Sequence, residues 1–165
     1  MSRIQRIAPC LWFDSQAEAA ALHYVSIFKN SSINAIARYP NAGVETHGRP
    51  EGSVMTVDFV LDGQTFTALN GGPHFKFNEA VSLQVYCDTQ AEIDHYWAAL
   101  AKGGDPKTQQ CGWLKDKYGL SWQVVPATIA QMFADHTSER AQRAMLAMLK
   151  MKKLDIAELE RAAAG

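Results

Sequence analysis

Residues 14–18, "DSQAE", return almost unchanged at residues 88–92 as "DTQAE", and this repeat decides how the chain is divided. Each pentapeptide follows an apolar run of the kind that forms a buried strand, residues 7–13 in one case and 80–87 in the other. A pattern with helical periodicity follows in both places. The repeat therefore predicts that one strand–helix unit occurs twice in the chain.

Both repeated helices, and a third near the C-terminus, begin with the spacing of a capping box. In a capping box the first side chain accepts a bond from the backbone of the fourth residue, whose side chain reaches back in return. The pairs with this spacing are Ser15/Glu18, Thr89/Glu92 and Asp155/Glu158.

Three further strands are expected after each repeated helix. In the first half they are residues 33–39 and a hairpin over 53–70, with Asp62–Gly63 at a tight primed turn. In the second half two strands flank "DKYG" (116–119), and another, the sixth strand of the chain, is expected near 107–111. The pattern predicts an α+β fold of two βαβββ modules followed by C-terminal helices.

Composition excludes several classes of function. The chain has 165 residues, 47% of them hydrophobic and 20% charged, which suits one globular domain. A net charge of −1 gives no general attraction to nucleic acid or to an anionic membrane. No apolar run reaches the roughly 20 residues that span a bilayer, and the N-terminus lacks the pattern of a signal peptide. Three cysteines without a CxxC pair suit a reducing compartment. We expect a cytoplasmic protein that binds neither nucleic acid nor membranes.

Four longer strings resemble one known family. They are "PCLWFDSQAEAAALHYVSIF" (9–28), "FTALNGGPHFKFNEAVSLQV" (66–85), "CGWLKDKYGLSWQVVP" (111–126) and "AMLKMKKLDIAEL" (147–159). They are similar to the PhnB-like family, whose domain carries the description 3-demethylubiquinone-9 3-methyltransferase. That family lies in the vicinal oxygen chelate, or glyoxalase/bleomycin-resistance, superfamily.

The resemblance implies paired βαβββ modules that form cup-shaped mixed sheets, a pocket inside the cup, and a homodimer. On this basis we expect residues 1–165 to form a single domain. Module one covers about 5–72, module two about 78–126, and a helical extension about 127–165.

The resemblance also tells where a metal would be held, because many superfamily members chelate their substrate to a divalent ion. The corresponding positions fall near Pro9, Asn70, Ser82 and Gln123. None of them is His, Asp or Glu, the side chains that bind catalytic divalent metals. The glycine-rich turn of common S-adenosylmethionine-binding folds is absent after the first strand. We therefore predict no metal site and no cofactor.

Uncharged polar residues remain as candidates for a pocket. Period-two alternation places Ser82, Gln84 and Tyr86 on one face of their strand, and Ser121 and Gln123 on one face of the last strand. With aromatic walls, such groups suit a small and partly apolar ligand. The alternative is that these polar side chains hydrogen-bond to one another in the core and bind no ligand. The predicted pocket residues are Trp12, Asn70, Ser82, Gln84, Trp113 and Gln123.

Nucleophilic chemistry has one candidate. Cys111 lies near a turn and is a candidate reactive thiol, whereas Cys10 and Cys87 lie in apolar strands and are expected to be small buried hydrophobes. The sequence thus favours a metal-independent protein that binds a small molecule. The alternative is an enzyme acting on a small metabolite, in which Asn70, Gln84 or Gln123 polarises an oxygen and a Cys or Tyr supplies a proton, so whether the chain is an enzyme stays open. A third hypothesis is a stress or regulatory factor whose C-terminal helices recruit a partner.

Overall fold

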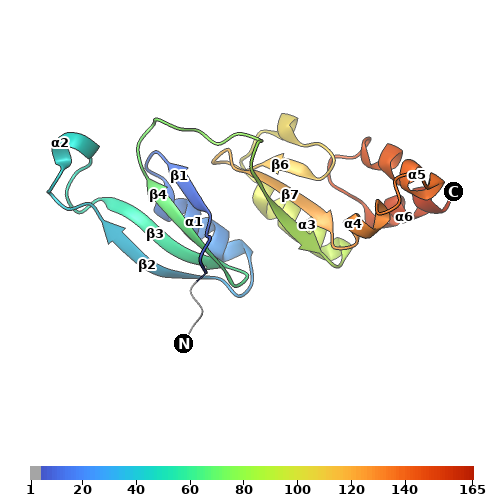
Figure 1. Cartoon of the computed structure of the whole chain (residues 1–165), viewed down its shortest axis with the longest axis horizontal. Helices are drawn as coiled ribbons and strands as arrows, with labels where there is room; N and C mark the ends of the chain where they lie inside the picture. Colours follow the sequence, from blue (N-terminus) through green and yellow to red (C-terminus); the bar gives the residue numbers. More distant parts are fainter. Residues whose placement is uncertain (1–4) are drawn as a thin grey trace. The chain divides into compact units, whose positions relative to one another are not determined.

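The computed structural model describes residues 5–165, and the chain separates into two compact units, the first ending at Lys76 and the second beginning at Phe77 (Figure 1). Each unit holds one mixed sheet and opens with a strand followed by a helix, so the α+β prediction is confirmed. Within the described residues, no helix combines the length and the apolar character that crossing a bilayer requires.

The first unit contains a four-stranded sheet in the order β1-β4-β3-β2. Strand β1 is parallel to β4, and the other neighbours are antiparallel. Helix α1 packs on one face of this sheet. The elements are β1 (Cys10–Phe13), α1 (Ala17–Ile27), β2 (Ser32–Arg38), α2 (Val44–His47), β3 (Val54–Leu61) and β4 (Gln64–Asn70).

Alternation along the hairpin strands creates the core of the first unit. Val57, Phe59 and Leu61 of β3 are buried, and Tyr24 of α1 is fully buried with them. At the hairpin turn, Asp62 and Gly63 have φ values of 46° and 81°. Two successive positive φ angles define a type I′ turn, which matches the twist of the strands it joins. The predicted hairpin is therefore confirmed.

The start of α1 differs from the prediction. Its N-cap is Gln16, and no side chain of the cap residue bonds the helix. The N–H of Ala17 donates instead to Oδ1 of Asn70 at 2.8 Å. The predicted cap at Ser15 is wrong because a side chain from β4 satisfies the first exposed N–H of the helix.

The other two predicted caps are present. The N–H of Glu92 donates to Oγ1 of Thr89 at 3.2 Å, and the Glu92 carboxylate accepts from the N–H of Asp88 at 2.7 Å. Near the C-terminus, the N–H of Glu158 donates to Oδ1 of Asp155 at 2.9 Å. Both helices start where the sequence predicted because their caps lie within the same short segment.

The second unit contains a three-stranded sheet in the order β5-β7-β6, with β5 parallel to β7 and β6 antiparallel to it. Helix α3 packs on one face of this sheet. The elements are β5 (Ser82–Cys87), α3 (Gln90–Ala101), the 3₁₀ helix η1 (Pro106–Thr108), β6 (Trp113–Lys115), β7 (Ser121–Pro126), α4 (Ile129–Met132), α5 (Glu139–Met148) and α6 (Ile156–Ala164).

The strand expected near 107–111 is not formed in the second sheet, which corrects the prediction of a complete second βαβββ module. This segment holds η1 and a turn, and Cys111 and Gly112 have φ values of 50° and 82°, which an extended strand cannot contain. Their N–H groups donate to the carbonyls of Met151 and Lys152 at 2.9 and 2.7 Å. The backbone is satisfied by the C-terminal segment and needs no strand pairing there.

The C-terminal extension is fixed to the second unit by apolar and polar contacts. Leu154 and Leu159 are fully buried and pack against Val125 at the end of β7. The side-chain amide of Gln90, at the start of α3, donates to the Leu154 carbonyl at 3.1 Å and accepts from the Ile156 N–H at 2.9 Å. The extension is therefore an integral part of this unit.

Candidate functional site

The second sheet carries the predicted polar groups on one face, opposite the face that buries Val85 and Cys87 beneath α3. Strand register arranges them in two rows across β6, β7 and β5, since directly paired residues point to the same side. One row is Trp113, Gln123 and Gln84, and the next is Lys115, Ser121 and Ser82. Four of the six predicted pocket residues thus lie side by side.

Hydrogen bonds connect four of these side chains in a row, which we call the amide chain: Tyr86, Gln84, Gln123 and Ser82. The Tyr86 hydroxyl donates to Oε1 of Gln84 at 2.8 Å, and Nε2 of Gln84 donates to Oε1 of Gln123 at 3.4 Å. Nε2 of Gln123 then donates to Oγ of Ser82 at 2.8 Å. These residues do bond to one another, but Gln84 and Tyr86 are exposed and not in the core. Each amide keeps a further N–H and lone pair for another partner.

A cavity of about 540 Å³ lies beside the second row. Ser121 is only 1% exposed, and among the described residues its Oγ has no hydrogen-bond partner. Trp113 belongs both to the first row and to the cavity wall, so the two features are continuous. The lining residues are Glu79, Lys107, Thr108, Gln110, Cys111, Trp113, Leu114, Lys115 and Ser121.

Charge in this cavity is unbalanced. The Lys115 ammonium forms an ion pair with the Glu79 carboxylate, and its hydrogen bond is the main cause that holds the pKa of Glu79 below the ordinary value. Lys107 adds a second positive charge to the lining. Positive charges in the lining therefore exceed negative charges by one.

Cys111 is the thiol that lines this cavity. Its positive φ turns the backbone, and the N–H bond to Met151 holds that turn. Nε2 of Gln110 donates to the Cys111 sulfur at 3.3 Å. The candidate reactive thiol thus lies against the same space as the unpartnered hydroxyl of Ser121.

The other two cysteines lie in different surroundings. Cys87 is fully buried, as predicted, and burial, followed by the charges of Glu92 and Asp88, raises its pKa to about 12. Cys10 is exposed, so the expectation that it is buried is wrong. Partial desolvation of its sulfur and the nearby charge of Asp58 still raise the pKa of Cys10.

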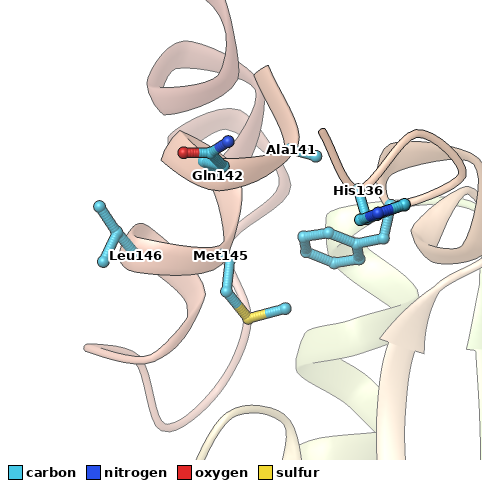
Figure 2. Close-up of a pocket in the computed structure, with 6 residues that line it drawn as sticks. His136, Ala141, Gln142, Met145 and Leu146 are labelled. Atoms are coloured by element: carbon cyan, nitrogen blue, oxygen red, sulfur yellow. The ribbon is translucent and has the colours of Figure 1, made fainter. Parts of the chain in front are cut away.

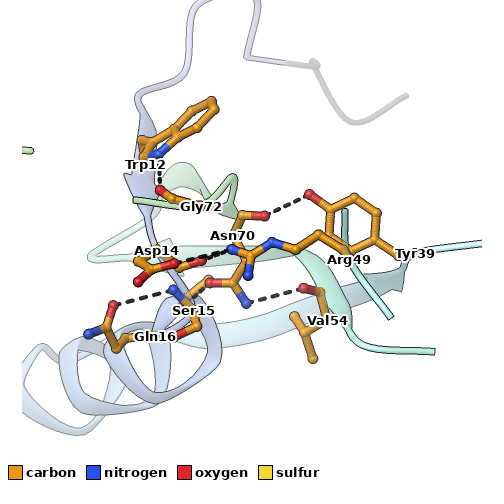
Figure 3. A network of polar contacts seen from close by, with 10 residues as sticks. Trp12, Asp14, Ser15, Gln16, Tyr39, Arg49, Val54, Asn70 and Gly72 are labelled. Atoms are coloured by element: carbon orange, nitrogen blue, oxygen red, sulfur yellow. Dashed lines mark hydrogen bonds and ion pairs between the residues drawn. The ribbon is translucent and has the colours of Figure 1, made fainter. Parts of the chain in front are cut away.

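Trp12 lies in the first unit, and Figure 3 shows its indole nitrogen directed at the backbone of Gly72, in the glycine pair that follows β4. Its Nε1–H donates to the carbonyl of Gly72 at 2.9 Å, and its ring meets that of Phe75 edge-on with centroids 4.9 Å apart. A Cβ atom on Gly71 would lie 2.2 Å from Trp12 Cζ2. A glycine at position 71 is therefore required for the indole of Trp12 to lie against the backbone here.

Asn70 also lies in the first unit, and its amide is engaged by the frame of that unit. The side chain is buried, accepts from the N–H of Ala17, and donates to the carbonyl of Val54 at 3.1 Å. The Tyr39 hydroxyl donates to the Asn70 backbone carbonyl at 2.6 Å (Figure 3). These bonds give the Asn70 side chain a structural role, so no ligand is needed to explain an asparagine at this position.

The donors at the expected metal positions do not fit a divalent metal. Ser82 and Gln123 offer a hydroxyl and an amide already bonded to each other, and Asn70 bonds to backbone groups. Across residues 5–165, no three His, Cys, Asp or Glu side chains come close enough to hold an ion. A catalytic divalent metal takes its ligands from those residue types.

A second hollow, of about 390 Å³, lies along α5 (Figure 2). The apolar residues of α5 and its C-cap are divided between core and surface: Ala141 and Ala144 are buried, whereas Met145 and Leu149 are exposed. Figure 2 shows Met145 and His136 at this hollow, whose wall is mostly apolar. It lacks the clustered polar groups of the second sheet.

Sequence reasoning missed the charged groups of the cavity, which are Glu79, Lys107 and Lys115. The signal for Lys115 was available, because alternation along β6 places it on the same side as Trp113. Glu79 lies before β5 in irregular chain, where no periodicity indicates a direction. Its contact with Lys115 could be seen only in the folded unit.

Comparison with known proteins agrees with this architecture. A family profile described as 3-demethylubiquinone-9 3-methyltransferase matches residues 5–125, so the resemblance noted for 147–159 lies beyond the matched part. No curated protein matches the sequence.

Several solved structures are similar to this chain. The PhnB protein of Bacillus cereus, described under the same methyltransferase name, is 38% identical with a TM-score of 0.63, covering 74% of this chain and 100% of that one. A Pseudomonas aeruginosa protein is 20% identical with a TM-score of 0.56, covering 74% and 97%. A fosfomycin resistance protein of Listeria monocytogenes is 13% identical with a TM-score of 0.49, covering 77% and 96%. The chain belongs to the PhnB-like family described as 3-demethylubiquinone-9 3-methyltransferase.

Proposed function

We propose that this chain is a metal-independent protein that binds a small molecule on the open face of its second sheet. The observation that carries the proposal is the joining of the two polar rows to the cavity beside β6. Gln84 and Gln123 supply hydrogen bonds, and Trp113 supplies an apolar wall.

The size and chemistry of this region support a small ligand. Pockets for small molecules are typically about 300–1,000 Å³, mostly apolar, with a few placed polar groups. The amide chain fixes the orientation of Gln84 and Gln123, since each side chain is held by a neighbour. Groups held in this way lose little freedom when a ligand binds.

An enzyme acting on a small metabolite is the second candidate. The observation that favours it is a thiol, Cys111, beside the unpartnered hydroxyl of Ser121 in one cavity. The methyltransferase description of the family finds less support in this fold. Common S-adenosylmethionine enzymes bind the cofactor on a doubly wound parallel sheet, and both sheets here are mixed, with antiparallel neighbours.

Two further expectations stay as proposals. We propose a homodimer, which the resemblance to this family implies, and sedimentation velocity over a concentration series tests it. We also propose a cytoplasmic location without nucleic-acid or membrane partners, which fractionation of cells expressing the chain tests.

A screen of metabolites by thermal stability tests the binding proposal, because a ligand of the folded state raises the unfolding temperature. For each hit, a Gln84→Ala/Gln123→Ala variant should bind about tenfold or more weakly, since two hydrogen bonds are removed. The matched control is Gln64→Ala/Gln131→Ala, which removes two exposed glutamines from other elements. Affinity should not change with EDTA. Full affinity in the Gln84/Gln123 variant would refute the site, and loss of affinity with EDTA would refute metal independence.

A further inference from the structure

We propose that the cavity beside β6 binds an oxyanion group of the ligand, a carboxylate or a phosphate, between the Ser121 hydroxyl and the Lys115 ammonium. This inference rests on the proposed function and adds to it the chemical class of the ligand. It depends on three features of the cavity: an unused donor, a displaceable ion pair and an excess of positive charge.

The unused donor is the hydroxyl of Ser121. The residue is 1% exposed and belongs to the cavity lining, and its buried Oγ has no hydrogen-bond partner among the described residues. Buried polar groups are almost always bonded, because leaving one unpaired is costly. An acceptor oxygen placed in the cavity would satisfy it.

The displaceable ion pair is that of Lys115 with Glu79. Lys115 is paired with Ser121 in the strand register, so the two side chains lie next to each other on one face. The Lys115 side chain is 24% exposed, but that of Glu79 is 64% exposed and comes from irregular chain. An exposed ion pair contributes little to stability. A ligand carboxylate or phosphate can therefore take the place of the Glu79 carboxylate.

The excess of positive charge comes from Lys107, the second lysine of the lining, which Glu79 does not neutralise. Trp113 and Leu114 provide the apolar part of the wall. The cavity thus suits an anion carried on an apolar body. A neutral ligand would leave the charge of Lys107 unused.

Cys111 provides a reporter in this cavity, because its alkylation can be followed by mass spectrometry of the peptide. Iodoacetate and iodoacetamide differ only in a carboxylate against a neutral amide. The measured quantity is the ratio of their rates at Cys111, divided by the same ratio for free N-acetylcysteine. At low salt this quotient should be about two to five, the range that one favourable ion pair gives, and should fall toward one as salt is added.

Variants assign the effect to the proposed groups. Lys115→Gln should bring the quotient close to one, Ser121→Ala should lower it, and Glu79→Gln should raise it because Lys115 is then free. The matched control is Lys102→Gln, an exposed lysine outside the cavity lining, which should leave the quotient unchanged. If Ser121→Ala fails to fold, the two charge variants still decide. A wild-type quotient of one, a Glu79→Gln variant without change, or a Cys111 that neither reagent reaches would overturn the proposal.

Competition separates the two sources of the oxyanion. Benzoate and inorganic phosphate are compared, at equal ionic strength, for protection of Cys111 from iodoacetamide. Protection by benzoate assigns the site to carboxylates, and protection by phosphate assigns it to phosphates; protection by neither overturns the proposal. If the Gln84→Ala/Gln123→Ala variant loses its ligand while the quotient is one, the binding function stands and only the oxyanion subsite fails. If instead the Gln84→Ala/Gln123→Ala variant keeps its ligand while the quotient is well above one, the binding face is refuted and the oxyanion subsite stands.

Discussion

Replacing Gly71 by alanine should destabilise the first unit through a steric conflict with Trp12. The new Cβ would lie 2.2 Å from Cζ2 of Trp12 and 2.4 Å from two other ring atoms. The ring cannot move freely, because its Nε1–H is bonded to Gly72 and its edge packs against Phe75. No positive φ is required at Gly71, so the expected cost is steric and not conformational.

The size of the effect follows from two terms. Forcing an extra methyl group into a packed site costs about 1–3 kcal/mol. Displacing the indole also loses its hydrogen bond to Gly72, which contributes about 1 kcal/mol. Gly71→Ala should therefore lower the free energy of unfolding by about 2–4 kcal/mol.

A double-mutant cycle with Trp12→Leu isolates the steric term. With the indole removed, the same Gly71→Ala change should cost less than about 1 kcal/mol, because the conflict is gone and alanine lowers the entropy of the unfolded chain. The coupling energy between the two positions should then be about 2–3 kcal/mol. Urea unfolding followed by far-ultraviolet circular dichroism measures it without relying on the fluorescence of the removed tryptophan. An equal cost of Gly71→Ala in both backgrounds would refute the reasoning.

Three further changes test other parts of the structure. Asn70→Ala should lower the free energy of unfolding by about 2–4 kcal/mol in urea titrations, because the Ala17 N–H and the Val54 carbonyl lose a buried partner; a neutral effect would contradict the capping role. Gln90→Ala removes two bonds to the C-terminal extension and should speed tryptic cleavage at 152–153 several-fold, about 1–2 kcal/mol of local opening, whereas Gln131→Ala should not. Cys87 has a pKa of about 12 when folded and 9.0 as its ordinary value, so the folded state keeps a proton that the unfolded state releases. Stability should therefore fall above about pH 9, by up to about 1.4 kcal/mol per pH unit, and Cys87→Ala should remove that part of the slope.

The elements that the sequence predicted correctly are those whose polar groups are satisfied nearby. The Thr89 and Asp155 caps use partners three residues away, and the Asp62–Gly63 turn needs only its own two positive φ angles. The faces of β5 and β7 follow from alternation for the same reason. Residues within a few positions of one another determine these features, so they could be predicted from short stretches of sequence.

The features that sequence reasoning missed depend on partners far along the chain. The first N–H of α1 is taken by Asn70, 53 residues away, and this replaced the predicted cap. The strand expected near 107–111 is not formed because its backbone bonds to Met151 and Lys152. The site shows the same division: the row of Gln84 and Gln123 was predictable, but the cavity between Glu79 and Cys111 was not.

The C-terminal extension supports the wall of the candidate site from behind, even though the family match ends at residue 125. Carbonyls at Met151 and Lys152 hold the turn that presents Cys111 to the cavity. Leu154 packs so closely on Gly112 that a Cβ there would lie 3.1 Å from its Cδ1. A change in the extension therefore moves the cavity wall without touching either polar row.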